Sequence, residues 1–81
     1  MLAELLTKAQ SSGNHIQFAT AQVAKNLSNA ELVSLKDEIN NKRFNMFLDN
    51  LDSDDEEDAK FARQSAEKII AGRLEMMSRG E

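Results

Sequence analysis

The stretch with the most evident chemical potential is a run of acidic residues at positions 49–58. It contains seven carboxylates and no cation, so it holds all the excess negative charge of the chain. An EF-hand loop binds Ca²⁺ through oxygens at alternate positions, and it needs glycine at its sixth position and glutamate at its twelfth. A loop that began at Asp52 would have Glu57 and Arg63 there, and a start at Asn50 fails in the same way. The sequence therefore predicts no calcium loop and no other metal site.

The same run is suited to two other roles. Ser53 is followed three residues later by Glu56, which is the spacing of a capping box at a helix start. Carboxylates in the first turn are favourable there because the helix N-terminus carries a partial positive charge. An exposed acidic run can also speed association with a basic partner. The predicted electrostatic binding residues are Asp52, Asp54, Asp55, Glu56, Glu57 and Asp58.

The sequence contains little that would support catalysis. The single histidine, His15, lies beside a predicted turn, and the chain has neither a second histidine nor a cysteine. No glycine-rich phosphate loop, nucleophile motif or H-E-x-x-H pair is present. A domain of this size also has little room for a buried pocket. We therefore expect a protein without enzymatic activity and without a cofactor.

Nucleic-acid binding is the main rival hypothesis, because residues 20–40 loosely suggest a helix-turn-helix. A recognition helix should present a basic, phosphate-compatible surface. The second helix would instead carry the acids Glu31, Asp37 and Glu38, with only Lys36 as an early cation. Nucleic acid is therefore a disfavoured partner. The other cations are interpreted as parts of a solvated mixed-charge face: Lys42, Arg43, Arg63, Lys68 and Arg73.

Two apolar clusters are the predicted contact with a partner. One is the densest apolar patch of the chain, at residues 44–51, and the other is a methionine pair near the C-terminal end. Methionine is adaptable and is favoured where a helix meets another protein. The predicted apolar binding residues are Phe44, Phe47, Leu48, Leu51, Met76 and Met77. Homodimerisation through these faces would complete a small core.

Composition explains why association is expected. The chain has 81 residues, which predicts a single domain, and it has no cysteine for a disulfide. A core of this size supplies only ~3–5 kcal/mol, so small domains commonly need a further source of stability. No apolar run approaches the ~18–20 residues that span a bilayer, and no signal-peptide pattern is present. We expect a soluble, cytoplasmic protein that does not bind membranes.

The elements that must position these residues are all predicted to be helical. The chain has no proline and is rich in Ala, Glu, Lys and Leu, which favour helix. Ser28 and Glu31 form a capping-box pattern ahead of the longest apolar stripe. Asn14 is the expected cap of the helix before it. The expected helices are two short ones at about 2–11 and 15–26, and two long ones at about 29–50 and 54–78.

The predicted stripe is interrupted inside the helix at 29–50. The polar stretch 40–43 stands where apolar residues should continue, and the stripe resumes about half a turn out of phase. A kink, or two halves that bury against different neighbours, would explain the interruption. The predicted stripe of the last helix has Phe61 and Leu74 on its flanks and consists of Ala59, Ala62, Ala66, Ile69, Ile70, Met76 and Met77.

The predicted fold is an all-α bundle of three or four helices, formed by residues 1–81 as one domain. Its two long helices form an antiparallel hairpin around the acidic turn. The favoured function is a non-enzymatic protein-binding module, a small regulator, adaptor or inhibitor that docks a helical face on a larger protein. Such a chain would also suit a virus- or phage-encoded regulator. The alternatives are a DNA-binding regulator and a structural or assembly subunit.

Overall fold

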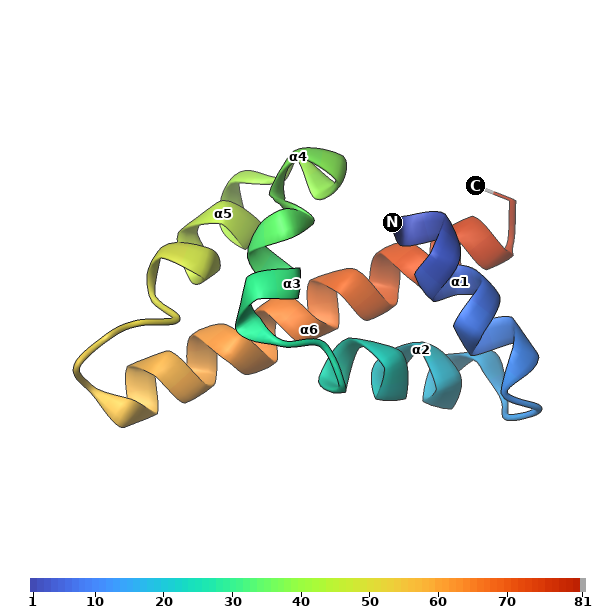
Figure 1. Ribbon diagram of the computed structural model, residues 1–81, viewed down its shortest axis with the longest axis horizontal. Coiled ribbons are helices and arrows are strands. Elements are labelled where there is room, and N and C mark those ends of the chain that lie inside the picture. The colour runs from blue at the N-terminus through green and yellow to red at the C-terminus, as the bar shows by residue number, and fades with distance from the viewer. Residues whose placement is uncertain (81) are drawn as a thin grey trace.

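The computed structural model describes residues 1–80, and these residues fold into helices joined by short connections (Figure 1). The all-α prediction is confirmed for this part of the chain. The helices are α1 (Leu2–Ser11), α2 (Ile16–Lys25), α3 (Asn29–Ser34), α4 (Lys36–Ile39), α5 (Lys42–Asp49) and α6 (Glu56–Ser78).

The first two helices lie close to their predicted positions, but the cap of α2 differs from the prediction. Asn14 was the expected cap, whereas His15 is the residue that caps the helix. The His15 Nδ1 atom accepts a hydrogen bond from the backbone N–H of Gln17 at 3.3 Å. The buried face of α2 consists of Ala19, Thr20 and Ala24. These small side chains allow α2 to pack closely on α6, and this is the most extensive contact between any two helices.

The predicted long helix at 29–50 is wrong, because three short helices occupy this segment. Its start is as predicted: Ser28 Oγ accepts from the Glu31 N–H at 3.1 Å, and Glu31 Oε1 accepts from the Ser28 N–H at 2.9 Å. Asn40 then adopts the left-handed conformation, with φ 46°, which ends α4. Asn41 is extended, and its Oδ1 atom accepts from the N–H groups of Arg43 and Phe44. Asparagine tolerates both conformations, so the pair stops one helix and starts the next.

The last helix begins two residues later than predicted. Its cap is Asp55, whose Oδ1 atom accepts from the Glu57 N–H at 2.9 Å. Ser53, the predicted cap, instead accepts from the Asp55 N–H at 3.3 Å and so shapes the preceding turn. The first turn holds Glu56, Glu57 and Asp58, which agrees with the expected acidic helix start.

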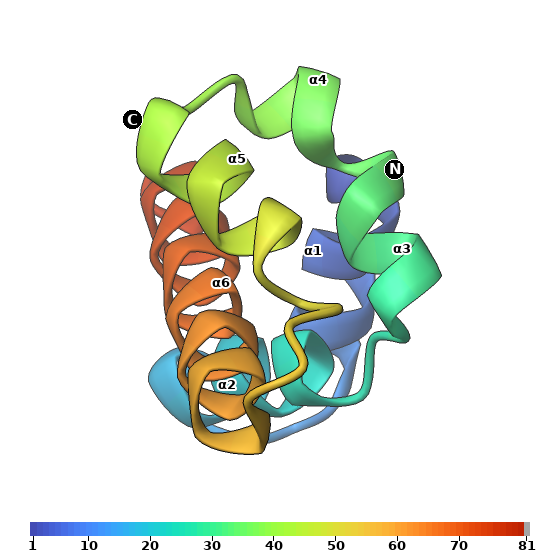
Figure 2. The ribbon, with the colours of Figure 1, turned by 90° about the vertical axis from the view of Figure 1, so that its left-hand side faces the viewer.

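α6 sets the shape of the molecule. A helix of this length spans roughly 34 Å, close to the longest dimension of 38 Å. α2 and α1 pack along one side of α6, and α5 packs over its N-terminal half (Figures 1 and 2). The predicted hairpin is therefore limited to α5 and α6, and α2 is the principal neighbour of the last helix.

The core lies between α6 and the shorter helices. It contains Leu32, Leu35 and Phe44 from the middle of the chain, and Ile70 and Leu74 from α6, all fully buried. Leu74 was expected on the flank of the stripe and is inside it. In the described part of the chain, no helix is both long and apolar enough to cross a membrane.

Candidate protein-binding groove

Most of the predicted apolar binding residues lie in the core of the single chain. Phe44 is fully buried, and Phe47, Leu48 and Leu51 are exposed by less than a tenth. Met76 is 45% exposed and Met77 is half-buried. In this conformation the densest apolar patch stabilises the fold, and of the six predicted residues only Met76 and Met77 are accessible to a partner. The spacing of apolar residues predicted this patch, but it did not show that helices of the same chain cover it.

A surface groove follows one flank of α6. Four hollows of about 300, 320, 420 and 570 Å³ lie along it in sequence. The opposite wall comes from α5 at one end and from α4 and the start of α1 at the other. Each hollow shares lining residues with the next one. The first and second share Phe47 and Phe61, the second and third share Asn41, Lys68 and Ile69, and the third and fourth share Arg73 and Met76. We call this continuous depression the α6 groove.

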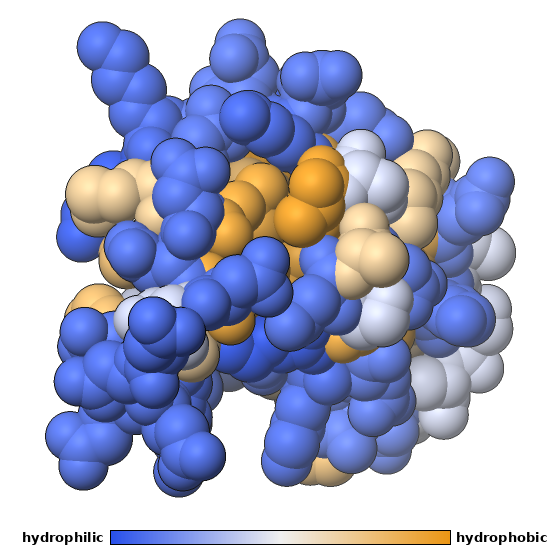
Figure 3. Space-filling model, turned by 60° about the vertical axis from the view of Figure 1, so that its left-hand side comes forward, coloured by the Kyte–Doolittle hydropathy of each residue, from blue (hydrophilic) through white to orange (hydrophobic). Residues whose placement is uncertain are grey.

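Exposed apolar side chains are concentrated in the α6 groove. Within residues 1–80, six large hydrophobic side chains are exposed, and four of them line the groove. The four are Met1, Met46, Phe61 and Met76. The face shown in Figure 3 is largely hydrophilic, with one larger hydrophobic patch near its centre and smaller ones at its margins. Clustered exposed apolar groups rimmed by polar residues mark interaction sites more often than scattered ones do.

Phe61 is the largest of these groups and was not predicted as a binding residue. It is 64% exposed, and the edge of its ring meets the ring of Phe47, with centroids 6.0 Å apart. The buried stripe of α6 passes through Ala62 and Ala66, so the neighbouring Phe61 points away from the core. The position of Phe61 on the flank of the predicted stripe was the sequence signal that its side chain could be exposed.

The middle of the α6 groove is basic. Arg43, Lys68 and Arg73 are exposed on its two walls, and none of them forms an ion pair within the described chain. At one end of the groove lies Asp58, next to the acidic run. At the other end Glu38 is already engaged, since its Oε2 atom accepts from the Leu2 N–H at 3.0 Å. This hydrogen bond lowers the pKa of Glu38.

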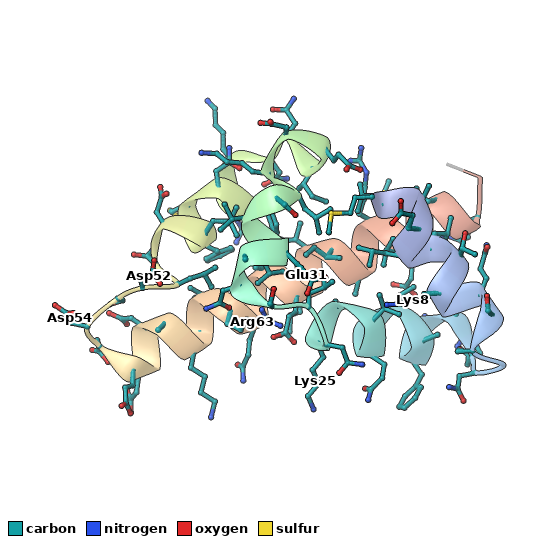
Figure 4. The ribbon with its side chains drawn as sticks, viewed as in Figure 1. Lys8, Lys25, Glu31, Asp52, Asp54 and Arg63 are labelled. Atoms are coloured by element: carbon teal, nitrogen blue, oxygen red, sulfur yellow. The ribbon has the colours of Figure 1, made fainter. Side chains whose placement is uncertain are left out.

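The acidic run projects from one end of the molecule. All six predicted electrostatic residues are exposed, and Asp52 and Asp54 lie at the α5–α6 connection, with Asp54 pointing outward (Figure 4). Asp55 also caps α6. Across residues 1–80 no group of three His, Cys, Asp or Glu side chains is arranged to hold a metal ion.

Arg63 is a structural residue that sequence reasoning placed on a solvated face. Its guanidinium donates to the backbone carbonyls of Lys25, at 3.0 Å, and Leu27, and to Asn29 Oδ1 at 3.1 Å. Its Nε atom also pairs with Glu67 at 2.8 Å. Arg63 therefore satisfies the free carbonyls at the end of α2 and fixes the α2–α3 turn on α6 (Figure 4).

The segment that suggested a helix-turn-helix has a different role here. α3 has only six residues, and the Glu31 carboxylate at its start is held in the capping box. Hydrogen bonds from Ser28, backbone first, lower the pKa of Glu31, with smaller contributions from Lys8 and Arg63. The start of α3 is thus anionic, which does not favour contact with phosphates.

Comparison of the chain with protein-family models, with characterised proteins and with solved structures finds no match. We therefore infer function from the geometry and charge of the α6 groove.

Proposed function

We propose that the protein is a non-enzymatic binding module that holds an amphipathic helix of a partner protein in the α6 groove. The observation that carries this proposal is the clustering of exposed Met46, Phe61 and Met76 along one continuous depression. A helix-in-groove complex uses such apolar anchors, spaced at helical intervals on both partners.

Charge defines the kind of helix that would bind. The exposed cations in the middle of the groove, Arg43, Lys68 and Arg73, favour carboxylates beside the apolar stripe of the ligand. Such complementarity raises the association rate and selects orientation. The ligand is accordingly an apolar-faced helix with acidic flanking residues, and the protein acts as a regulator or adaptor by covering that helix.

The test compares two matched variants. Phe61→Arg places a charge in the groove, and Phe18→Arg makes the same change at a residue that is 58% exposed on α2, outside the groove. Both side chains are solvent-exposed, so we expect both variants to fold. Tagged wild type and variants are used to capture proteins from the native source, with and without nuclease, and the captured protein is then titrated in purified form.

We expect a nuclease-resistant partner that binds the wild type and Phe18→Arg but binds Phe61→Arg at least about tenfold more weakly, the loss expected for a contact worth more than ~1.4 kcal/mol. A partner that binds all three proteins equally would contradict the groove as the site. Capture that disappears with nuclease, or binding that weakens steeply with salt, would favour the DNA-binding alternative.

A further inference from the structure

The exposed face of α6 that lines the groove has an internal symmetry. Its residues recur at helical spacing along the whole helix, and they are Phe61, Ser65, Lys68, Ile69, Gly72 and Met76. Phe61 and Met76 stand at the two ends of this stripe, Ser65 and Gly72 stand inside them, and Lys68 and Ile69 flank its midpoint. Phe61 and Met76 are equally far from that midpoint, and so are Ser65 and Gly72.

This pattern points to one particular ligand. In two antiparallel helices related by a two-fold axis, residues equally distant from the axis face each other. With the axis between Lys68 and Ile69, Phe61 of one chain faces Met76 of the other, and Ser65 faces Gly72. We propose that a second copy of this chain occupies the α6 groove, with its α6 antiparallel to the first. The inference rests on the proposed function and names the helix that binds.

The opposed pairs are chemically suited to each other. A methionine sulfur against an aromatic ring is a favourable contact, and both partners are exposed in the single chain. Serine opposite glycine permits close approach of the two backbones near the axis. A Cβ atom built on Gly72 meets nothing within 4 Å, so this chain leaves the space beside Gly72 open for a second helix.

Charge favours the antiparallel orientation over the parallel one. The first turn of α6 and its cap are acidic, from Asp55 to Asp58, whereas Arg79 lies at the C-terminal end of the helix. With the axis between Lys68 and Ile69, antiparallel packing places the acidic start of each helix beside the C-terminal end of the other, where Asp58 faces Arg79. Parallel packing would place like charges together. α6 is itself an apolar-faced helix with an acidic end, which is the ligand that the groove favours.

Disulfide cross-linking tests the register directly, because the chain has no natural cysteine. We expect a mixture of Ser65→Cys and Gly72→Cys chains to form the mixed disulfide, since the two sulfur-bearing carbons would lie within the ~4 Å that a disulfide needs. Ser65→Cys alone should cross-link poorly. Lys60→Cys, exposed on another face of α6, is the matched control and should not cross-link. Efficient Ser65→Cys homodimers without the mixed product would overturn the antiparallel arrangement.

Sedimentation measures the association itself. Wild type should pass from monomer to dimer as concentration rises. Gly72→Arg fills the open space at the axis and should raise the dimer dissociation constant at least about tenfold, while Gln64→Arg, on an exposed position away from the stripe, should not. Circular dichroism verifies that both variants are helical. A wild type that stays monomeric at all concentrations, or equal dimerisation of both variants, would overturn the proposal. If Gly72→Arg does not fold, the cross-linking of Ser65→Cys with Gly72→Cys tests the dimer instead.

The outcomes separate this inference from the proposed function. A chain that remains monomeric but captures a partner through Phe61 refutes the dimer and keeps the binding module. A chain that dimerises with the expected cross-link but captures no other protein keeps the dimer and refutes the regulator or adaptor role.

Discussion

At the scale of single residues, polar side chains join segments that are far apart in the sequence. Arg63 contacts the end of α2 and the start of α3 from a position more than 30 residues later. Glu31 closes a local capping box at the start of α3. Both side chains satisfy backbone groups that a helix end leaves without partners. They therefore define where the short helices end and begin.

Arg63→Ala should lower the free energy of unfolding by roughly 1.5–3 kcal/mol, because the carbonyls at the end of α2 lose hydrogen bonds from a charged donor and the bond to Leu27 is partly buried. Arg63→Lys should recover only part of the loss, since an ammonium lacks the planar fork that reaches several acceptors. Urea unfolding followed by circular dichroism measures both variants. Lys60→Ala, at an exposed cation on the same helix, should change stability by less than about 0.5 kcal/mol. Equal effects of Arg63→Ala and Lys60→Ala would contradict the assigned contacts.

Glu31 should make stability depend on pH. Its pKa in the folded chain is lowered from the ordinary value of 4.5, mainly by hydrogen bonding with Ser28. A lowered pKa means that the carboxylate stabilises the fold fully above its unfolded-state pKa and loses this effect as pH falls through the folded-state pKa. Glu31→Gln should therefore be less stable than wild type at neutral pH, and the difference should shrink with acidification. A difference that is constant down to low pH would exclude this carboxylate as its source.

At the scale of elements, the middle of the chain shows how local conformation overrides helix periodicity. One apolar stripe appeared to run from residue 29 to residue 50, with a polar interruption at 40–43. Asn40 takes positive φ and Asn41 caps the next helix, so the chain changes direction there. The change of direction places Ile39 and Phe44 in the same core although they belong to different helices. The phase shift in the stripe was the sequence signal for this break.

Asn40 provides the test of that break. The left-handed conformation destabilises most residues that have a Cβ atom by roughly 1–2 kcal/mol. The cost is smaller for asparagine, and glycine adopts this conformation freely because it has no Cβ atom. Asn40→Ala should thus lower stability by about 1 kcal/mol, whereas Asn40→Gly should leave it nearly unchanged. Thermal and urea unfolding of the two variants give the comparison. Alanine as stable as glycine at this position would mean that the helix continues through residue 40.

At the scale of the whole molecule, charge is separated along the longest axis. The acidic run lies at the end where α5 meets α6 (Figures 1 and 4). The exposed cations of the α6 groove line its two middle hollows. A separation of this kind orients an approaching partner before contact and raises the association rate. We therefore expect the same carboxylates to stabilise the start of α6 and to bias which way a second helix enters the groove.

Neutralising part of the run should slow association without unfolding the chain. The triple change Asp54→Asn, Glu56→Gln and Glu57→Gln leaves the Asp55 cap intact. We expect the dimer association rate to fall several-fold at low salt and to approach that of wild type at high salt, where charges are screened beyond a few ångströms. Stopped-flow mixing after dilution measures the rate, and circular dichroism verifies the fold. An unchanged rate at low salt would remove steering as a role of the run.

The sequence alone determined the features that depend on neighbours along the chain. These include the helical content, the capping box at Ser28, the first helix at 2–11 and the exposed acidic start of the last helix. Each follows from propensity, spacing or helix-end chemistry within a few residues. The small face of α2 was also visible as a row of alanines that could approach another helix.

Only the tertiary structure decided which apolar side chains face inward. Periodicity places Phe61 and Leu74 alike on the flanks of the stripe of α6, yet Leu74 is fully buried and Phe61 is mostly exposed. Burial depends on which helices pack together, and that in turn depends on the direction change at Asn40 and on the contacts of Arg63 with the α2–α3 turn. These contacts join residues distant in sequence, so no local pattern encodes them. The α6 groove arises from the same packing, because it is the flank of the longest helix that the shorter helices leave uncovered.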